Sequence, residues 1–147
     1  MPGVEPCVVN TGNSFLLVPL PDGPSVASVG PDLDLVTAVS DELDLIGYYL
    51  FSRATRMPGR HAGTRMFAPR FGIAEEAGTG MAAGPLACFL HDHLGVRNRE
   101  LFIEQGWLMQ PPSPSVITVT LELAAGRIAR LMAGGAARAV SAMQVEL

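Results

Sequence analysis

Hydrophobic side chains dominate one stretch of the chain, residues 81–94, where no charged residue occurs before Asp92. On a helix these side chains point in every direction, and a helix that is apolar on all faces must be buried on all faces. At roughly 14 residues it is too short to cross a bilayer, which takes about 20. The pattern therefore predicts a central helix with a β-sheet wrapped around it.

Short apolar or alternating runs, bounded by glycine and proline, predict strands on both sides of that helix. They lie at residues 6–9, 15–20, 45–52, 64–69, 101–105, 115–123, 127–133 and 136–145. Helical spacing predicts a second helix from Pro31, with Gly30 as its N-cap, while residues 19–24 and 53–63 are expected to be loops. The expected fold class is α+β, a curled β-sheet or barrel wrapped around one central buried helix, in a single domain spanning residues 1–147.

The composition is that of a globular chain, since 48% of the residues are hydrophobic and 16% are charged. A net charge of −4 argues against general nucleic-acid binding. The N-terminus lacks a signal-peptide pattern, and no apolar run reaches the ~18 residues that a membrane helix needs. We therefore expect a cytoplasmic protein without membrane or nucleic-acid partners. The high apolar fraction suggests that a protein partner covers part of the surface.

A glycine-rich turn, Gly78, Thr79 and Gly80, leads into the central helix. Its backbone N–H groups, with those of Met81 and Ala82, are expected to lack partners within the helix and to point outward. Such a group of amides at a helix N-terminus is suited to a carboxylate or phosphate. The alternative is a turn that only reverses the chain.

Two adjacent carboxylates, Glu75 and Glu76, precede this turn. Like charges held close together do not both ionise easily, which would favour acid–base work by the pair. Neighbouring residues on a strand point to opposite faces, however, so one of the two is expected to face solvent.

The histidines and cysteines give weaker signals. His91 and His93 lie at the end of the central helix without a third ligand nearby, so no metal site is predicted. His61 lies in an arginine-rich loop and is expected to be solvated. Cys7 and Cys88 are expected to be small packing residues rather than nucleophiles.

Residues 65–90, RMFAPRFGIAEEAGTGMAAGPLACFL, resemble a segment of PhzF-like proteins, the phenazine-biosynthesis isomerase family, which is related in fold to diaminopimelate epimerase. In that family the segment typically reads R-x-F-A-P-x-x-G-I-x-E-D-P-A-T-G-S-A-x-G-P-L. Three further stretches resemble the family in the same order, namely residues 9–20, residues 105–113 and residues 131–140. The resemblance covers almost the whole chain, but it extends only to the C-terminal half of the family.

The resemblance implies an active site between two similar halves, no metal or organic cofactor, and a proton shuttle on a small carboxylate substrate. The principal glutamate and the histidine of the family belong to the N-terminal half and have no counterpart here. Glu76 stands where the family has an aspartate, which makes it the candidate acid or base. Met81 replaces the serine of the family, and Pro111 replaces an arginine. The candidate binding groups for the substrate anion are the backbone amides of Gly78, Thr79, Gly80, Met81 and Ala82.

Two functions follow from these observations and both stay open. The leading one is a cofactor-independent isomerase or epimerase-like protein of small-molecule metabolism, phenazine-like secondary metabolism included. The alternative is a non-catalytic protein that binds a small anion, or a subunit that pairs with a separate N-terminal half; an inactive remnant is a third. The expected partners are a small carboxylate-bearing molecule and either a second copy, forming a homodimer, or a complementary half.

Overall fold

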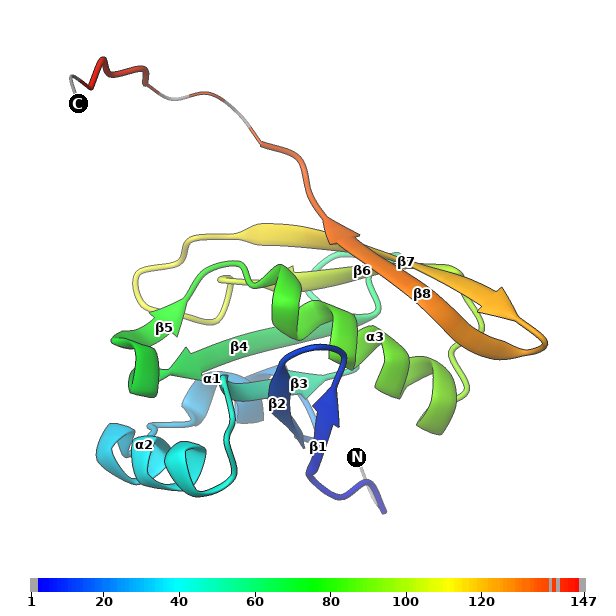
Figure 1. Cartoon of the computed structure of the whole chain (residues 1–147). Coiled ribbons are helices and arrows are strands. Elements are labelled where there is room, and N and C mark those ends of the chain that lie inside the picture. The colour runs from blue at the N-terminus through cyan, green and yellow to red at the C-terminus, as the bar shows by residue number, and fades with distance from the viewer. Residues whose placement is uncertain (1–2, 138, 140, 146–147) are drawn as a thin grey trace.

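The computed structural model describes residues 3–137, 139 and 141–145 (Figure 1). Its strands and helices follow one another as β1 (Cys7–Asn10), β2 (Ser14–Pro19), α1 (Gly23–Ser28), α2 (Leu33–Glu42), β3 (Gly47–Ser52), β4 (Ala62–Ala68), a 3₁₀ turn η1 (Pro69–Phe71), β5 (Ile73–Glu76), α3 (Gly80–His93), β6 (Glu100–Gln105), β7 (Ser115–Ala124) and β8 (Arg127–Gly134).

One sheet contains all of these strands, in the order β1-β2-β3-β4-β6-β7-β8, with β5 paired to β4 at the side. The β2–β3 and β4–β6 pairs are parallel, and the other pairs are antiparallel. The sheet curls around α3, so that β1 and β8 form its two ends (Figure 1). The predicted α+β fold, a curled sheet around a central helix, is confirmed.

The core lies between the concave face of the sheet and α3. Alternate residues of the strands, among them Phe15, Tyr49 and Ile103, contribute fully buried side chains to it. Small residues on α3 let the sheet come close, and a Cβ at Gly84 would lie 2.9 Å from Leu131 Cδ1. The predicted burial of this helix is therefore confirmed for most of its length.

The outer face of the sheet is partly covered by α1 and α2, and both differ from the sequence prediction. The predicted loop at residues 19–24 is shorter than expected, because α1 already begins at Gly23, where the side chain of Asp22 accepts a hydrogen bond from Ser25 N at 2.8 Å. The N-cap of α2 is Asp32 rather than Gly30, and its Oδ1 accepts a hydrogen bond from Leu35 N at 3.0 Å. A carboxylate satisfies a free amide of the first turn, which glycine cannot do.

The prediction of a last strand at residues 136–145 is wrong for those of its residues that the structure describes. Those residues are exposed and carry no strand, and the chain leaves the body of the molecule after β8 (Figure 1). The sheet gains β5 instead, which pairs with β4. Alternation along the chain gives a segment a strand-like pattern, but the segment becomes a strand only where its backbone forms hydrogen bonds with a neighbouring strand.

Candidate functional site

The candidate site lies where β5 ends and α3 begins. Glu76 is the last residue of β5, Thr79 is the N-cap of α3, and Gly80 is the first residue of that helix. The turn between them is held against the ends of β6 and β7, because Ser115 Oγ donates to Ala77 O at 2.7 Å. The position of the turn is therefore set by the sheet as well as by the helix.

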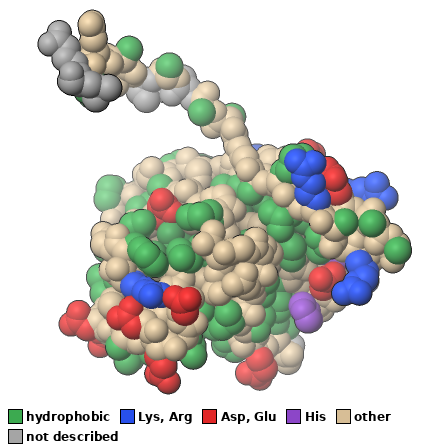
Figure 2. Space-filling view, in the orientation of Figure 1, with side chains coloured by type: hydrophobic (Ala, Val, Ile, Leu, Met, Phe, Trp, Pro, Cys, Tyr) green, Lys and Arg blue, Asp and Glu red, His purple; other side chains and the backbone are tan. Residues whose placement is uncertain are grey.

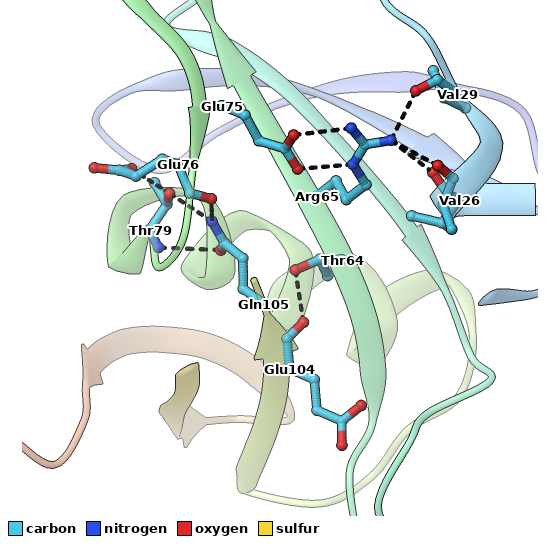
Figure 3. A network of polar contacts seen from close by, with 10 residues as sticks. Val26, Val29, Thr64, Arg65, Glu75, Glu76, Thr79, Glu104 and Gln105 are labelled. Atoms are coloured by element: carbon cyan, nitrogen blue, oxygen red, sulfur yellow. Dashed lines mark hydrogen bonds and ion pairs between the residues drawn. The ribbon is translucent and has the colours of Figure 1, made fainter. Parts of the chain in front are cut away.

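Gln105, at the end of β6, is fully buried beneath this turn and is bonded through both groups of its amide (Figure 3). Its Nε2 donates to Glu76 O at 2.7 Å and to Thr79 Oγ1 at 3.0 Å. Its Oε1 accepts from Thr79 N at 3.1 Å and from Tyr49 Oη at 2.9 Å. Burial raises the pKa of Tyr49 well above its ordinary value, so the phenol keeps its proton and acts as the donor.

The Glu76 side chain is half-buried and accepts a hydrogen bond at Oε2 from the hydroxyl of Thr79. It lines a pocket of about 300 Å³. Apart from Glu76 and Thr79, the pocket walls are apolar and come from β4, β5 and the segments beside them, namely Ile46, Met66, Ala68, Phe71, Ile73 and Met81. A carboxylate at the wall of an apolar pocket is suited to moving a proton to or from a bound molecule.

The predicted group of five amides is smaller in the structure. Thr79 N is bonded to Gln105 Oε1, and Ala82 N donates to Thr79 O at 3.2 Å, so neither is available to a ligand. Within the described residues, the N–H groups of Gly78, Gly80 and Met81 have no acceptor. Sequence reasoning could not anticipate the loss of Thr79 N, because its partner lies 26 residues away in the chain.

Glu75 and Glu76 leave β5 in opposite directions, as the alternation of a strand predicts (Figure 3). The expectation that one of them faces solvent is wrong. Glu75 forms a bidentate ion pair with Arg65, with distances of 2.8 Å and 2.9 Å. Arg65 also donates to the carbonyl oxygens of Val26, Ala27 and Val29 at the end of α1. Glu75 is therefore part of the scaffold, and Glu76 alone faces the pocket.

A third carboxylate, Glu104, was missed by sequence analysis. It is 2% exposed, and its two oxygens accept hydrogen bonds from Arg56 N at 2.8 Å and Met57 N at 2.9 Å. These bonds hold the segment before β4 against β6. Both partners are backbone amides about 47 residues away in the chain, so no side-chain pattern in the sequence could have indicated them.

His61 is half-buried instead of solvated. Its Nδ1 accepts a hydrogen bond from Phe102 N at 3.0 Å, and the backbone N–H of His61 donates to Phe102 O at 2.8 Å. The residue thus continues the pairing of β4 with β6 beyond the strands. The predicted loop is correspondingly shorter, because β4 already begins at Ala62.

The remaining candidates pack against the core. His91 is buried with Nδ1 2.7 Å from Asp92 Oδ1, and His93 stacks on Phe89 with ring centroids 4.9 Å apart. Burial raises the pKa of the Cys88 thiol, which disfavours the nucleophilic thiolate. Among the described residues, no group of three or more potential metal ligands comes together.

None of the helices in the described part of the chain has the length and apolar character that a membrane crossing requires.

Comparison with known proteins gives consistent matches. Residues 1–142 match the family model described as phenazine biosynthesis-like protein. The chain is 34% identical over 94 residues to the uncharacterized isomerase YddE of Escherichia coli, and this alignment covers 63% of this chain and 31% of that protein. It is 29% identical over 129 residues to trans-2,3-dihydro-3-hydroxyanthranilate isomerase of Pseudomonas chlororaphis, which covers 87% of this chain and 43% of that enzyme.

Among solved structures, the chain resembles a PhzF-family phenazine biosynthesis protein of Bacillus anthracis, with a TM-score of 0.66 and 20% sequence identity. The match covers 84% of this chain and 42% of that protein, and it supports the fold. The chain thus spans less than half the length of each of these three relatives.

Proposed function

Because the chain belongs to the phenazine biosynthesis-like family, we propose that it binds a small carboxylate-bearing molecule and shuttles a proton on it, as a cofactor-independent isomerase. The observation that carries the proposal is the placement of Glu76 in the pocket wall, beside the first turn of α3. The free amides of Gly80 and Met81 would hold the carboxylate of the substrate, because helix N-termini favour anions. Glu76 would take or return the proton at a nearby carbon.

Glu76 can take and return a proton in an exchange that uses one base, but a second acid or base would assist an isomerisation that moves the proton between two carbons. Among the described residues that line this pocket, Glu76 is the one titratable group. The second group would therefore come from another protein body, either a second copy or a complementary half.

A non-catalytic anion-binding protein is the second candidate. It is favoured by Met81, which occupies the second position of α3 and supplies no hydroxyl to the site. Such a protein would use the free amides and would leave Glu76 without a chemical task.

The change Glu76→Gln separates the two functions, because it removes the titrating group and keeps the size of the side chain. We expect exchange of the substrate Cα–H in deuterated water to fall by about 10²-fold or more, the usual contribution of a general acid or base. Anion binding, followed by the amide shifts of Gly80 and Met81 on addition of small carboxylates or sulfate, should persist.

Glu122→Gln is a matched control, since it removes the same charge from an exposed position of β7. It should leave both exchange and binding unchanged. Binding without exchange in the wild type, across small amino and hydroxy carboxylates and in the presence of a complementary half, would favour the binding protein. Gly80→Pro removes one of the amide donors and should weaken binding under either function.

A further inference from the structure

We infer that Thr79 is a positioning residue for Glu76: its hydroxyl is turned toward the carboxylate by Gln105, fixes Oε2 as an acceptor, and leaves Oε1 as the atom that carries the exchanged proton. The inference rests on the proposed function only for the chemical role of Glu76. The orientation of the hydroxyl follows from the hydrogen bonds of the described residues and is tested separately below.

The orientation of the Gln105 amide is determined by two backbone groups that have no choice of role. Thr79 N can only donate, and it lies 3.1 Å from Oε1. The carbonyl oxygen of Glu76 can only accept, and it lies 2.7 Å from Nε2. Exchanging the oxygen and nitrogen of the amide would set donor against donor and acceptor against acceptor. The amide therefore has a single orientation.

That orientation decides the role of the Thr79 hydroxyl. The second hydrogen of Gln105 Nε2 points to Thr79 Oγ1 at 3.0 Å, so the hydroxyl accepts there. A hydroxyl has one hydrogen of its own, and that hydrogen is left for Glu76 Oε2. Tyr49 also holds the Gln105 amide in this orientation, because its hydroxyl donates to Gln105 Oε1 at 2.9 Å.

The use of Thr79 is unusual for its position. A threonine at an N-cap commonly accepts a hydrogen bond from an amide of the first helical turn. Thr79 is the N-cap of α3, yet its side chain makes no such bond. The hydroxyl is directed to Glu76 instead, and the first-turn amides of Gly80 and Met81 remain without an acceptor among the described residues. One side chain thus orients the carboxylate and leaves the anion site open.

The two oxygens of the Glu76 carboxylate therefore have different roles. Oε2 faces the hydrogen of the Thr79 hydroxyl, so a proton on the carboxyl group belongs on Oε1. In the exchange step the substrate C–H bond breaks, its proton forms a bond with Oε1, and the electron pair stays on the substrate. Return of the proton from Oε1 reverses these changes, and no other reactant is consumed.

The test compares Thr79→Val, which keeps the shape of the side chain and removes the hydroxyl, with Thr79→Ser, which retains the hydroxyl. We expect Thr79→Val to lower kcat for proton exchange by about 10- to 100-fold, the effect of misplacing a general base. The affinity for acetate or sulfate should change by less than about twofold, because the free amides are retained. Thr79→Ser should exchange protons at close to the wild-type rate, because it keeps the hydroxyl.

Nuclear magnetic resonance supplies a readout that does not depend on turnover. In Thr79→Val one of the two Gln105 side-chain N–H signals should move upfield, and the three-bond couplings of the Glu76 side chain should show averaging over rotamers. Wild type and Thr79→Ser should both show two shifted N–H signals and one Glu76 rotamer. If Thr79→Val does not fold, Thr79→Ala is used in its place and is judged by the Glu76 couplings and by exchange, because a water beside the smaller side chain can accept from Gln105 Nε2.

Unchanged Gln105 signals and unchanged Glu76 couplings in the hydroxyl-free variant would overturn the inference, and so would wild-type exchange in that variant. If the wild type shows no exchange at all but the signals respond as expected, the positioning by Thr79 stands and the proposed isomerase function fails. The two failures are therefore distinguishable.

Discussion

Glu75 and Glu76 are neighbours with identical side chains, yet they have different tasks in the folded chain. Glu75 is held by both nitrogens of the Arg65 guanidinium group that face it, at 2.8 Å and 2.9 Å. Removing one partner of a buried ion pair leaves an uncompensated charge, which is strongly destabilising. Glu76 meets a hydroxyl and an apolar pocket instead. The partner that each residue meets across the sheet decides which carboxylate is free for chemistry.

His61 leads to a prediction about pH at the same scale. Burial first, and then the positive charge of Arg53, hold the pKa of His61 below its ordinary value. The unfolded chain therefore binds a proton at His61 more readily than the folded protein does. The contribution of this residue to stability is present above about pH 6.5, the ordinary value for histidine, and is lost as the pH falls below it.

We expect the free energy of unfolding, measured with urea, to fall more between pH 7.5 and pH 5.5 in the wild type than in His61→Gln. Arg53→Gln removes the second cause of the lowered pKa and should reduce the fall without abolishing it. Equal losses in the wild type and His61→Gln would show that the protonation of His61 is not linked to folding.

The connection between β6 and β7 is the element that places the candidate site. Gly106 begins this connection with a φ of +78°, and a Cβ on it would lie 1.9 Å from Ser113 O and 2.9 Å from Ala77 O. Ser115, at the other end of the connection, donates to the same Ala77 carbonyl. The two ends of the β6–β7 connection therefore both contact the turn before α3 at Ala77, and there is no room for a side chain at Gly106.

A matched pair of substitutions tests whether this connection holds the turn in place. Gly106→Ala should lower the free energy of unfolding by about 2–5 kcal/mol, since a left-handed backbone and a steric clash act together. Gly72→Ala has a similar φ of +75° but nothing within 4 Å of the new Cβ. It should lose only about 1–2 kcal/mol, the cost of the backbone conformation alone. Equal losses in urea denaturation would mean that the connection yields easily and does not hold the turn.

One side of the central helix is only partly covered by the sheet. β1 and β8 are the ends of the sheet, and Met81 on α3, between them, is 57% exposed. Figure 2 shows hydrophobic side chains on the face that presents α3 and β1, whereas acidic side chains gather over α2. An exposed apolar face beside a candidate site is typical of a surface that a partner covers.

We therefore expect self-association into a homodimer. The mass of one chain is 15.5 kDa, and light scattering at micromolar concentration should give about twice that mass. Met81→Arg should shift the protein toward the monomer, because it places a charge on the apolar face. Leu35→Arg changes a side chain on α2 that is 61% exposed and should leave the assembly intact. A wild type that stays monomeric would argue against a homodimer and in favour of a complementary half.

Much of the fold could be predicted from the sequence because the signals were local. The largely apolar stretch at 81–94 became α3 at Gly80–His93, and seven of the eight predicted strands lie close to strands of the structure. Periodicity, glycines and prolines act over a few neighbouring residues, so they are visible without a partner. The glycine turn was found in the same way, whereas Glu76 was singled out by the segment that resembles the family. The roles of both in binding and catalysis stay predictions.

Tertiary structure alone decided which of these groups are free to act. The amide of Thr79 is used by Gln105, 26 residues away, and the carboxylate of Glu75 is used by Arg65 on the neighbouring strand. The segment around 136–145 has the pattern of a strand, but its described residues pair with no strand, whereas the short β5 pairs with β4. Hydrogen bonds and ion pairs join residues that the chain order keeps apart, so only the packed sheet determines which donors and acceptors remain for a ligand.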